Sequence, residues 1–195
     1  ATGEELARIP ALGVGTLAHD THGLVVARLA SGNLPGLERI PLDGGQRQAW
    51  TMRSCELLDV TANAVLISER AGNDRVRIAR NPTDGAILWQ IADGGGLGRH
   101  GDTAFVDTAG VIRAVDVRTG STRWESPPIP EARLIHINAG AGRVWAHGLL
   151  SPVVTVLDAR DGSILEQGEG SAPYVLNRAG ITVLFDEQGL RVWAD

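Results

Sequence analysis

The sequence contains a single cysteine, Cys55, and no lysine, so arginine supplies all 18 of its basic residues. One cysteine excludes a disulfide within the chain and any metal site built from several thiolates. The formal net charge is −5, and no basic cluster is interleaved with aromatic residues, which argues against a nucleic-acid partner. No apolar run reaches the ~18 residues that a transmembrane helix needs, so we predict no membrane span.

What the sequence does contain is the chemistry of tight turns. Glycine occurs 25 times and proline 9 times in a chain of 195 residues, of which 43% are hydrophobic. No stretch longer than about ten residues has the ~3.6-residue period of an amphipathic helix, whereas segments such as 111–116 alternate with a period of two. This pattern is typical of many short strands, and we predict an all-β chain that forms a single domain over residues 1–195.

A short unit recurs along the chain: an Asp or Asn, then a Gly, then a strand that carries a large apolar residue. Asp and Asn cap their own backbone in a tight turn, and Gly supplies the positive φ that the turn needs. The unit occurs at 42–50, 81–89, 116–124 and 158–165, and its apolar residues are Trp50, Trp89, Trp124 and Leu165. These residues are 39, 35 and 41 positions apart, which is the period of a four-stranded propeller blade.

Each repeat divides into four strands. The predicted strands are 56–60, 64–70, 75–80 and 86–91 in the second repeat, 97–100, 103–107, 111–116 and 121–125 in the third, and 134–138, 143–147, 153–157 and 163–167 in the fourth. We therefore predict a β-propeller of five four-stranded blades. The approximate blades are 14–53, 54–92, 93–128, 129–168, and 169–195 together with 1–10.

The two ends of the chain account for the fifth blade. Its repeat has only three predicted strands, at 174–177, 181–185 and 190–193. Joined to the start of the chain, its end reads RVWAD-ATGEELAR, which parallels RAVDVRTGSTRWE at 113–125. We expect the N-terminal strand to close the last blade, because an open propeller leaves unpaired sheet edges. The alternative is that the chain is a part of a larger propeller.

The third repeat, AFVDTAGVIRAVDVRTGSTRWESP at 104–127, resembles the PQQ-like β-propeller repeat. That family includes quinoprotein dehydrogenases, the propeller lipoprotein of bacterial outer-membrane assembly, and sensor domains of receptor kinases. The resemblance implies the fold and an extracytoplasmic location in bacteria. Its members usually have seven or eight blades, and five is a departure from that number. The quinoproteins also use a pair of adjacent cysteines, which a chain with Cys55 alone cannot supply.

The candidate binding residues are polar side chains on or just after the innermost strands, which line the channel of a propeller. They are His19, Asp59, Arg99, His100, His136, Asn138, Asn177 and Arg178. We predict no metal site, because His19, His100 and His136 occupy different depths in the repeats and lack a matching carboxylate. We also predict no cofactor. The quinone of the quinoproteins is bound through calcium, and this sequence has no calcium-binding loop. The tryptophans are expected to pack between blades.

No set of catalytic residues stands out in the sequence. It has no nucleophile elbow, no phosphate-binding loop and no recognisable pair of catalytic carboxylates. The leading hypothesis is a non-catalytic scaffold or binding module that uses one face or the channel mouth to bind a protein or a small ligand. The alternatives are a sensor or repeat portion of a larger bacterial propeller protein, and a quinone-dependent or hydrolytic enzyme.

Overall fold

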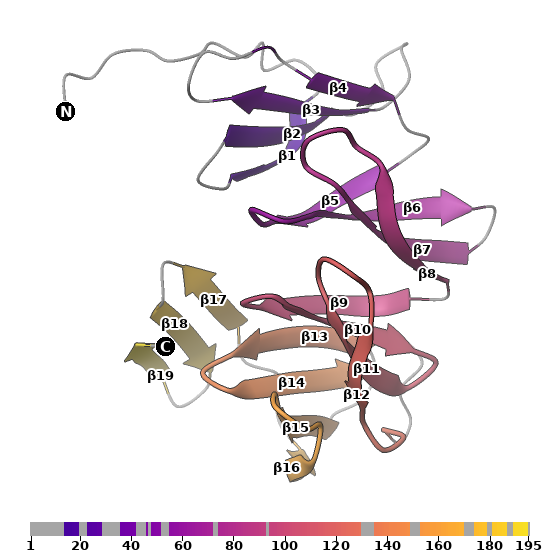
Figure 1. The fold of residues 1–195 in the computed structure, drawn as a ribbon. Helices are drawn as coiled ribbons and strands as arrows, with labels where there is room; N and C mark the ends of the chain where they lie inside the picture. Colours follow the sequence, from indigo (N-terminus) through magenta and orange to yellow (C-terminus); the bar gives the residue numbers. More distant parts are fainter. Residues whose placement is uncertain are drawn as a thin grey trace. The chain divides into compact units, whose positions relative to one another are not determined.

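The computed structural model describes most of the chain as β-strands and turns (Figure 1). The described residues are 14–19, 23–28, 36–41, 46, 48–51, 55–71, 74–92, 94–129, 135–148, 153–169, 174–178, 181–186 and 189–194. Among them there is no helix, and hence none long and apolar enough to cross a membrane. The chain forms two compact units, Ala1–Ile91 and Ala92–Asp195.

The first unit contains two four-stranded sheets whose strands pair in chain order. The first sheet consists of β1 (Val14–His19), β2 (Gly23–Arg28), β3 (Gly36–Pro41) and β4 (Gln48–Thr51). The second consists of β5 (Cys55–Val60), β6 (Val65–Ala71), β7 (Asp74–Arg80) and β8 (Ile87–Ala92), the last of which ends one residue beyond the unit.

The second unit contains three sheets with the same strand order. The third sheet of the chain consists of β9 (Gly94–His100), β10 (Thr103–Thr108), β11 (Val111–Asp116) and β12 (Thr122–Glu125). The fourth consists of β13 (Ile135–Gly140), β14 (Arg143–Gly148), β15 (Val153–Asp158) and β16 (Ile164–Glu169). The fifth has three described strands, β17 (Tyr174–Arg178), β18 (Ile181–Asp186) and β19 (Gly189–Ala194).

The predicted strands are confirmed, with boundaries that differ by three residues or fewer. The largest difference is at β9, predicted from residue 97, which begins at Gly94. The all-β class and the four-stranded antiparallel sheets are likewise as predicted. The N-terminal strand that we expect in the fifth sheet falls on residues 1–10, which lie outside the described residues.

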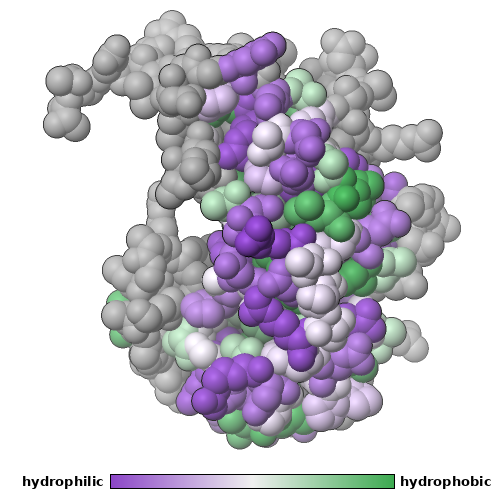
Figure 2. All heavy atoms as spheres, in the orientation of Figure 1, coloured by the Kyte–Doolittle hydropathy of each residue, from purple (hydrophilic) through white to green (hydrophobic). Residues whose placement is uncertain are grey.

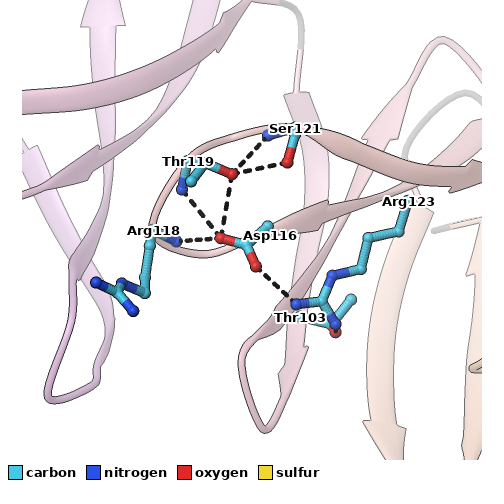
Figure 3. A network of polar contacts seen from close by, with 6 residues as sticks. All are labelled: Thr103, Asp116, Arg118, Thr119, Ser121 and Arg123. Carbon is cyan, nitrogen blue, oxygen red and sulfur yellow. Dashed lines mark hydrogen bonds and ion pairs between the residues drawn. The ribbon is translucent and has the colours of Figure 1, made fainter.

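The Asp/Asn–Gly unit forms the same hairpin turn in three sheets, and Figure 3 shows the one at Asp116. There the N–H of Gly120 donates to the Asp116 carbonyl (2.8 Å), and the Asp116 N–H donates to the Ser121 carbonyl (2.9 Å). The corresponding pairs begin at Asn81 and Asp158. Each turn has its glycine at positive φ, at 73° for Gly85, 70° for Gly120 and 75° for Gly162. The turns predicted at Asn81, Asp116 and Asp158 are thus confirmed, whereas residues 42–45 of the unit predicted at 42–50 lie outside the described residues.

The side chain of Asp116 connects this turn to the rest of its sheet. Its Oδ1 accepts hydrogen bonds from the N–H groups of Arg118 and Thr119, both at 3.0 Å. Its Oδ2 accepts from the Arg123 guanidinium (2.7 Å), which also donates to Thr103 Oγ1 (2.7 Å) (Figure 3). The Arg123 contact is the main cause of a pKa of about 2 for Asp116, well below the ordinary value of 3.8. The charged carboxylate therefore stabilises the turn.

Apolar side chains pack in clusters that join neighbouring sheets. Phe105, Ile112 and Ala114 of the third sheet pack with Ile137, Ala139, Val144, Ala146 and Leu157 of the fourth. Val25 and Leu37 of the first sheet pack with Leu57, Val65, Ile67 and Ile78 of the second. A tryptophan of the repeated unit packs against each cluster, Trp124 in the second unit and Trp50 in the first. This agrees with the expected packing of these two tryptophans between blades.

Candidate functional site

The first strands of successive sheets lie next to one another inside each unit. In the first unit β1 adjoins β5, and in the second unit β13 adjoins both β9 and β17. All eight predicted site residues lie on these first strands. They are His19 on β1, Asp59 on β5, Arg99 and His100 on β9, His136 and Asn138 on β13, and Asn177 and Arg178 on β17.

The backbones of β9 and β13 approach each other closely just before Arg99 and Asn138. A Cβ on Gly98 would lie 2.9 Å from the carbonyl oxygen of Ile137, so only glycine allows β9 and β13 to come so near. Arg99 and Asn138 directly follow this pair, and both are half-buried. Arg99 donates from Nη1 to the Gly101 carbonyl (2.9 Å), which holds its guanidinium near the end of β9.

Three further predicted residues lie on first strands of the second unit. His100, also half-buried, ends β9 opposite Thr103. On β17, Asn177 and Arg178 pair through their backbones with Thr182 and Ile181. We refer to Arg99, His100, Asn138, Asn177 and Arg178 as the strand-end group. The group therefore comes from three first strands, of which β13 adjoins the other two.

The two predicted residues of the first unit form a separate pair of positions. His19 is the last residue of β1 and pairs through its backbone with Leu24. Asp59 is half-buried on β5, and its Oδ1 accepts a hydrogen bond from the N–H of Val60 (2.7 Å). Since β1 adjoins β5, these positions lie on neighbouring strands of that unit.

His136 has a partner that the sequence reasoning missed. It lies opposite His147 in the β13–β14 pairing, and the two imidazole rings stack with centroids 5.1 Å apart and an interplanar angle of 21°. A signal for this pairing was present, because the two histidines are equally distant from the turn at Ala141 and Gly142. Residues equidistant from a hairpin turn face each other across the strands.

The environment of His147 favours the neutral form of its ring. Partial burial lowers the pKa of His147 below the ordinary value of 6.5, and the charge of His136 lowers it further. A contact of Nδ1 with the Gly148 carbonyl (3.2 Å) acts in the opposite direction. Among the described residues, no three His, Cys, Asp or Glu side chains gather closely enough to hold a metal ion.

Figure 2 shows the hydropathy of one face of the molecule. Hydrophilic residues cover most of the described surface that Figure 2 shows, and hydrophobic residues appear there in separate patches. The large apolar side chains that are most exposed belong to β18 and β19: Phe185 (59%), Leu190 (65%) and Val192 (58%).

Comparison with known proteins gives the fold and no family. No protein-family model matches the chain, and no curated protein matches it. Among solved structures, BamB from Moraxella catarrhalis matches with a TM-score of 0.58 and 16% identity, over 93% of this chain and 58% of that one. Kluyveromyces lactis Hsv2 matches with a TM-score of 0.63 and 10% identity, over 93% and 62% of the two chains.

A third similar structure is the nidogen/laminin complex, with a TM-score of 0.54 and 12% identity over 86% of this chain and 69% of that one. These relatives are β-propeller proteins. The chain therefore has the sheet architecture of a β-propeller, and at these identities the similarity concerns the fold alone. It spans less than two thirds of the length of BamB and of Hsv2.

Proposed function

We propose that the chain is a non-catalytic binding or scaffold module of the β-propeller type. The strand-end group is its binding site for a protein partner or a small ligand. The observation that supports this proposal is the close approach of Gly98 and Ile137, which lie directly before Arg99 and Asn138 on two adjacent first strands. A propeller concentrates such strand ends around its channel, where ligands can reach several blades at once.

The chemistry of the group favours a ligand rich in hydrogen-bond acceptors. Arginine and asparagine side chains supply several N–H donors, and an arginine fork matches a carboxylate. An acidic or carbonyl-rich loop of a protein partner meets this requirement. The nidogen/laminin complex is an example of a similar fold in complex with another protein, which supports a protein partner.

Site-specific cross-linking tests this function. A photoreactive amino acid at position 99 or 178 should give discrete cross-linked products in cells that express the chain. The matched control carries the same group at Glu166, an exposed position on β16. Identical product patterns from positions 99, 178 and 166 would overturn the proposed site. Cross-linking from position 178 that is lost on substitution of Arg99→Ala and Asn138→Ala would support it.

We further propose that the five sheets close into one propeller of the PQQ-like type, with residues 1–10 as the fourth strand of the fifth sheet. Support comes from one face of that sheet. Leu190 lies opposite Phe185, and Val192 opposite Val183, so these four apolar side chains share a face. Three of them are more than half exposed.

The matching positions of the other sheets are buried. Counted from the hairpin turn of each sheet, Leu190 and Val192 correspond to Ile112 and Ala114 of the third sheet, which are fully buried against the fourth. Leu37 occupies the same position in the first sheet and is buried against the second. In a closed ring the next blade covers this face, and burying each such side chain contributes about 1.5–3 kcal/mol.

Two measurements test closure. Deletion of residues 1–9 should lower the melting temperature or produce oligomers, because it exposes the edge of β19. Leu190→Ser should cost at least about 1.5 kcal/mol if the face is covered. The control is Ile87→Ser on β8, also about half exposed, which should change stability by less than about 0.5 kcal/mol. Closure is wrong if the deletion leaves a monomer with unchanged melting and the two serine variants behave alike.

A further inference from the structure

A pair of histidines on β13 and β14 lies outside the strand-end group. His136 and His147 are direct cross-strand partners, and their rings lie against each other with centroids 5.1 Å apart. Directly opposite residues of an antiparallel pair have Cβ atoms about 4.5–5.5 Å apart. The rings are stacked, so binding one ion requires the exposed His136 ring to rotate until a nitrogen of each ring faces the same point.

The hydrogen bond of His147 determines which nitrogen faces that point. Its Nδ1 lies 3.2 Å from the Gly148 carbonyl oxygen, an acceptor, so the proton belongs on Nδ1. The lone pair is then on Nε2, which is the atom available to a ligand. A carbonyl that fixes the tautomer of a histidine in this way is the usual outer partner of a metal-bound imidazole.

The neighbours of the pair define the kind of ion that fits. His147 faces Val154 on its other side, and Trp145 occupies the next position of the same row on β14. On the same face of β13 the next residue is Asn138. None of these residues carries a carboxylate, so the surroundings do not suit calcium or magnesium, which require several oxygen ligands. Imidazole nitrogens suit copper, nickel and zinc.

We propose that His136 and His147 form a two-histidine site for a divalent transition-metal ion of the copper, nickel and zinc class, with water completing the coordination. His136 is exposed, which leaves room for those waters, and His147 is half-buried, which keeps its ring in place. The site does not depend on the proposed partner binding. A metal bound here would join β13 to β14 close to Asn138, and it would be a separate property of the fourth sheet.

Copper is the most sensitive probe, because it binds nitrogen ligands more tightly than the other divalent ions of the series. Calorimetric titration of the whole chain with Cu²⁺ should give one site, and electron paramagnetic resonance should show two coordinated nitrogens at one equivalent. His136→Asn and His147→Asn should each weaken binding by at least about tenfold, the smallest loss seen when even an outer partner of a metal ligand is removed. His100→Asn, which removes a histidine from the neighbouring sheet, should leave the affinity unchanged.

The spectroscopic readout separates this site from copper bound elsewhere on the chain. In each single variant the two-nitrogen signal should be lost even if some copper still binds. His136 is exposed, so His136→Asn should melt like the unsubstituted chain and give a clean comparison. The proposal is wrong if His136→Asn and His147→Asn both bind copper within about twofold of the original affinity, or if His100→Asn weakens binding as much as they do.

Discussion

The indole ring of Trp124 lies directly on Gly162, the turn glycine of the following sheet. A Cβ on that glycine would be 2.5 Å from Cε3 of the ring. The indole N–H donates to the carbonyl of Ala159 in the same turn (3.0 Å). In the first unit Trp50 lies on Gly85 in the same way, with a Cβ 2.6 Å from its ring. In both places the tryptophan of one sheet thus packs on the turn glycine of the next sheet.

The Gly162→Ala variant should therefore lose stability for two reasons. Gly162 has a φ of 75°, a conformation that costs an L-residue about 1–2 kcal/mol. The added methyl group also collides with Trp124, and overpacking of this kind costs about 1–3 kcal/mol. We expect a total loss of about 2–5 kcal/mol in the free energy of unfolding, measured by denaturant titration.

Gly101→Ala is the matched control. Gly101 also has positive φ, at 55°, but a Cβ there would meet nothing within 4 Å. It should show only the backbone cost of about 1–2 kcal/mol. Equal losses for the two variants would mean that the tryptophan contact contributes nothing.

Trp124→Phe tests the indole hydrogen bond separately from the ring packing. Phenylalanine keeps an aromatic ring on Gly162 but cannot donate to the Ala159 carbonyl, so the loss should be about 1–2 kcal/mol. Trp124→Ala removes the ring as well and should cost about 3–5 kcal/mol. If the phenylalanine and alanine variants are equally unstable, the hydrogen bond and not the ring holds the two sheets together.

The local pattern of the sequence was sufficient for most of the fold. Asp116, Asp158 and Asn81 predict their hairpin turns because each side chain caps its own backbone, whatever lies around it. Burial was harder to predict, because it depends on the neighbouring sheet. Arg75 and Arg77 lie on the same side of β7 by alternation, yet Arg75 is exposed and Arg77 is buried. No local pattern distinguishes two such positions.

The candidate site shows the same division. The repeat predicts the order of the strands, and this order assigns Arg99 and Asn138 to the first strands of adjacent sheets. The close approach of these two strands depends on the contact of Gly98 with Ile137, which involves residues 39 positions apart. Equivalent positions of the repeats do not reveal His147, because it pairs with His136 across their own hairpin turn.

The charge of Asp116 should make stability depend on acidity. Its pKa of about 2 in the folded chain lies below the ordinary 3.8, chiefly because of Arg123. The stabilising contribution is therefore complete above about pH 4 and is lost as the pH falls toward 2. Arg123 is 45% exposed, so solvent screening limits the contribution to about 1 kcal/mol.

Asp116→Asn isolates this charge, because Asn81 caps the equivalent turn of the second sheet and asparagine preserves the cap. The variant should be less stable than the unsubstituted chain at pH 6, and the difference should disappear near pH 2. Arg123→Gln should reduce the same pH dependence. A difference between Asp116→Asn and the original chain that stays constant from pH 6 to pH 2 would contradict the assignment to charge.

Ser126, which directly follows β12, should be more sensitive to substitution by alanine than Ser121. It is buried, and its Oγ accepts from the N–H of Ile112 (3.0 Å) while donating to the Pro127 carbonyl (2.8 Å). Ser126→Ala deprives a buried N–H of an acceptor, which costs about 1–3 kcal/mol. Ser121, whose Oγ contacts Thr119 Oγ1 at 2.7 Å on the exposed turn, is the control, and Ser121→Ala should change the free energy of unfolding by less than about 0.5 kcal/mol. Hydrogen exchange at Ile112 provides a local measurement, since its amide should exchange faster in Ser126→Ala and at an unchanged rate in Ser121→Ala. Equal stability and equal exchange in both variants would show that the backbone bond from Ser126 to the Ile112 carbonyl (2.8 Å) holds this edge of β11 without the hydroxyl group.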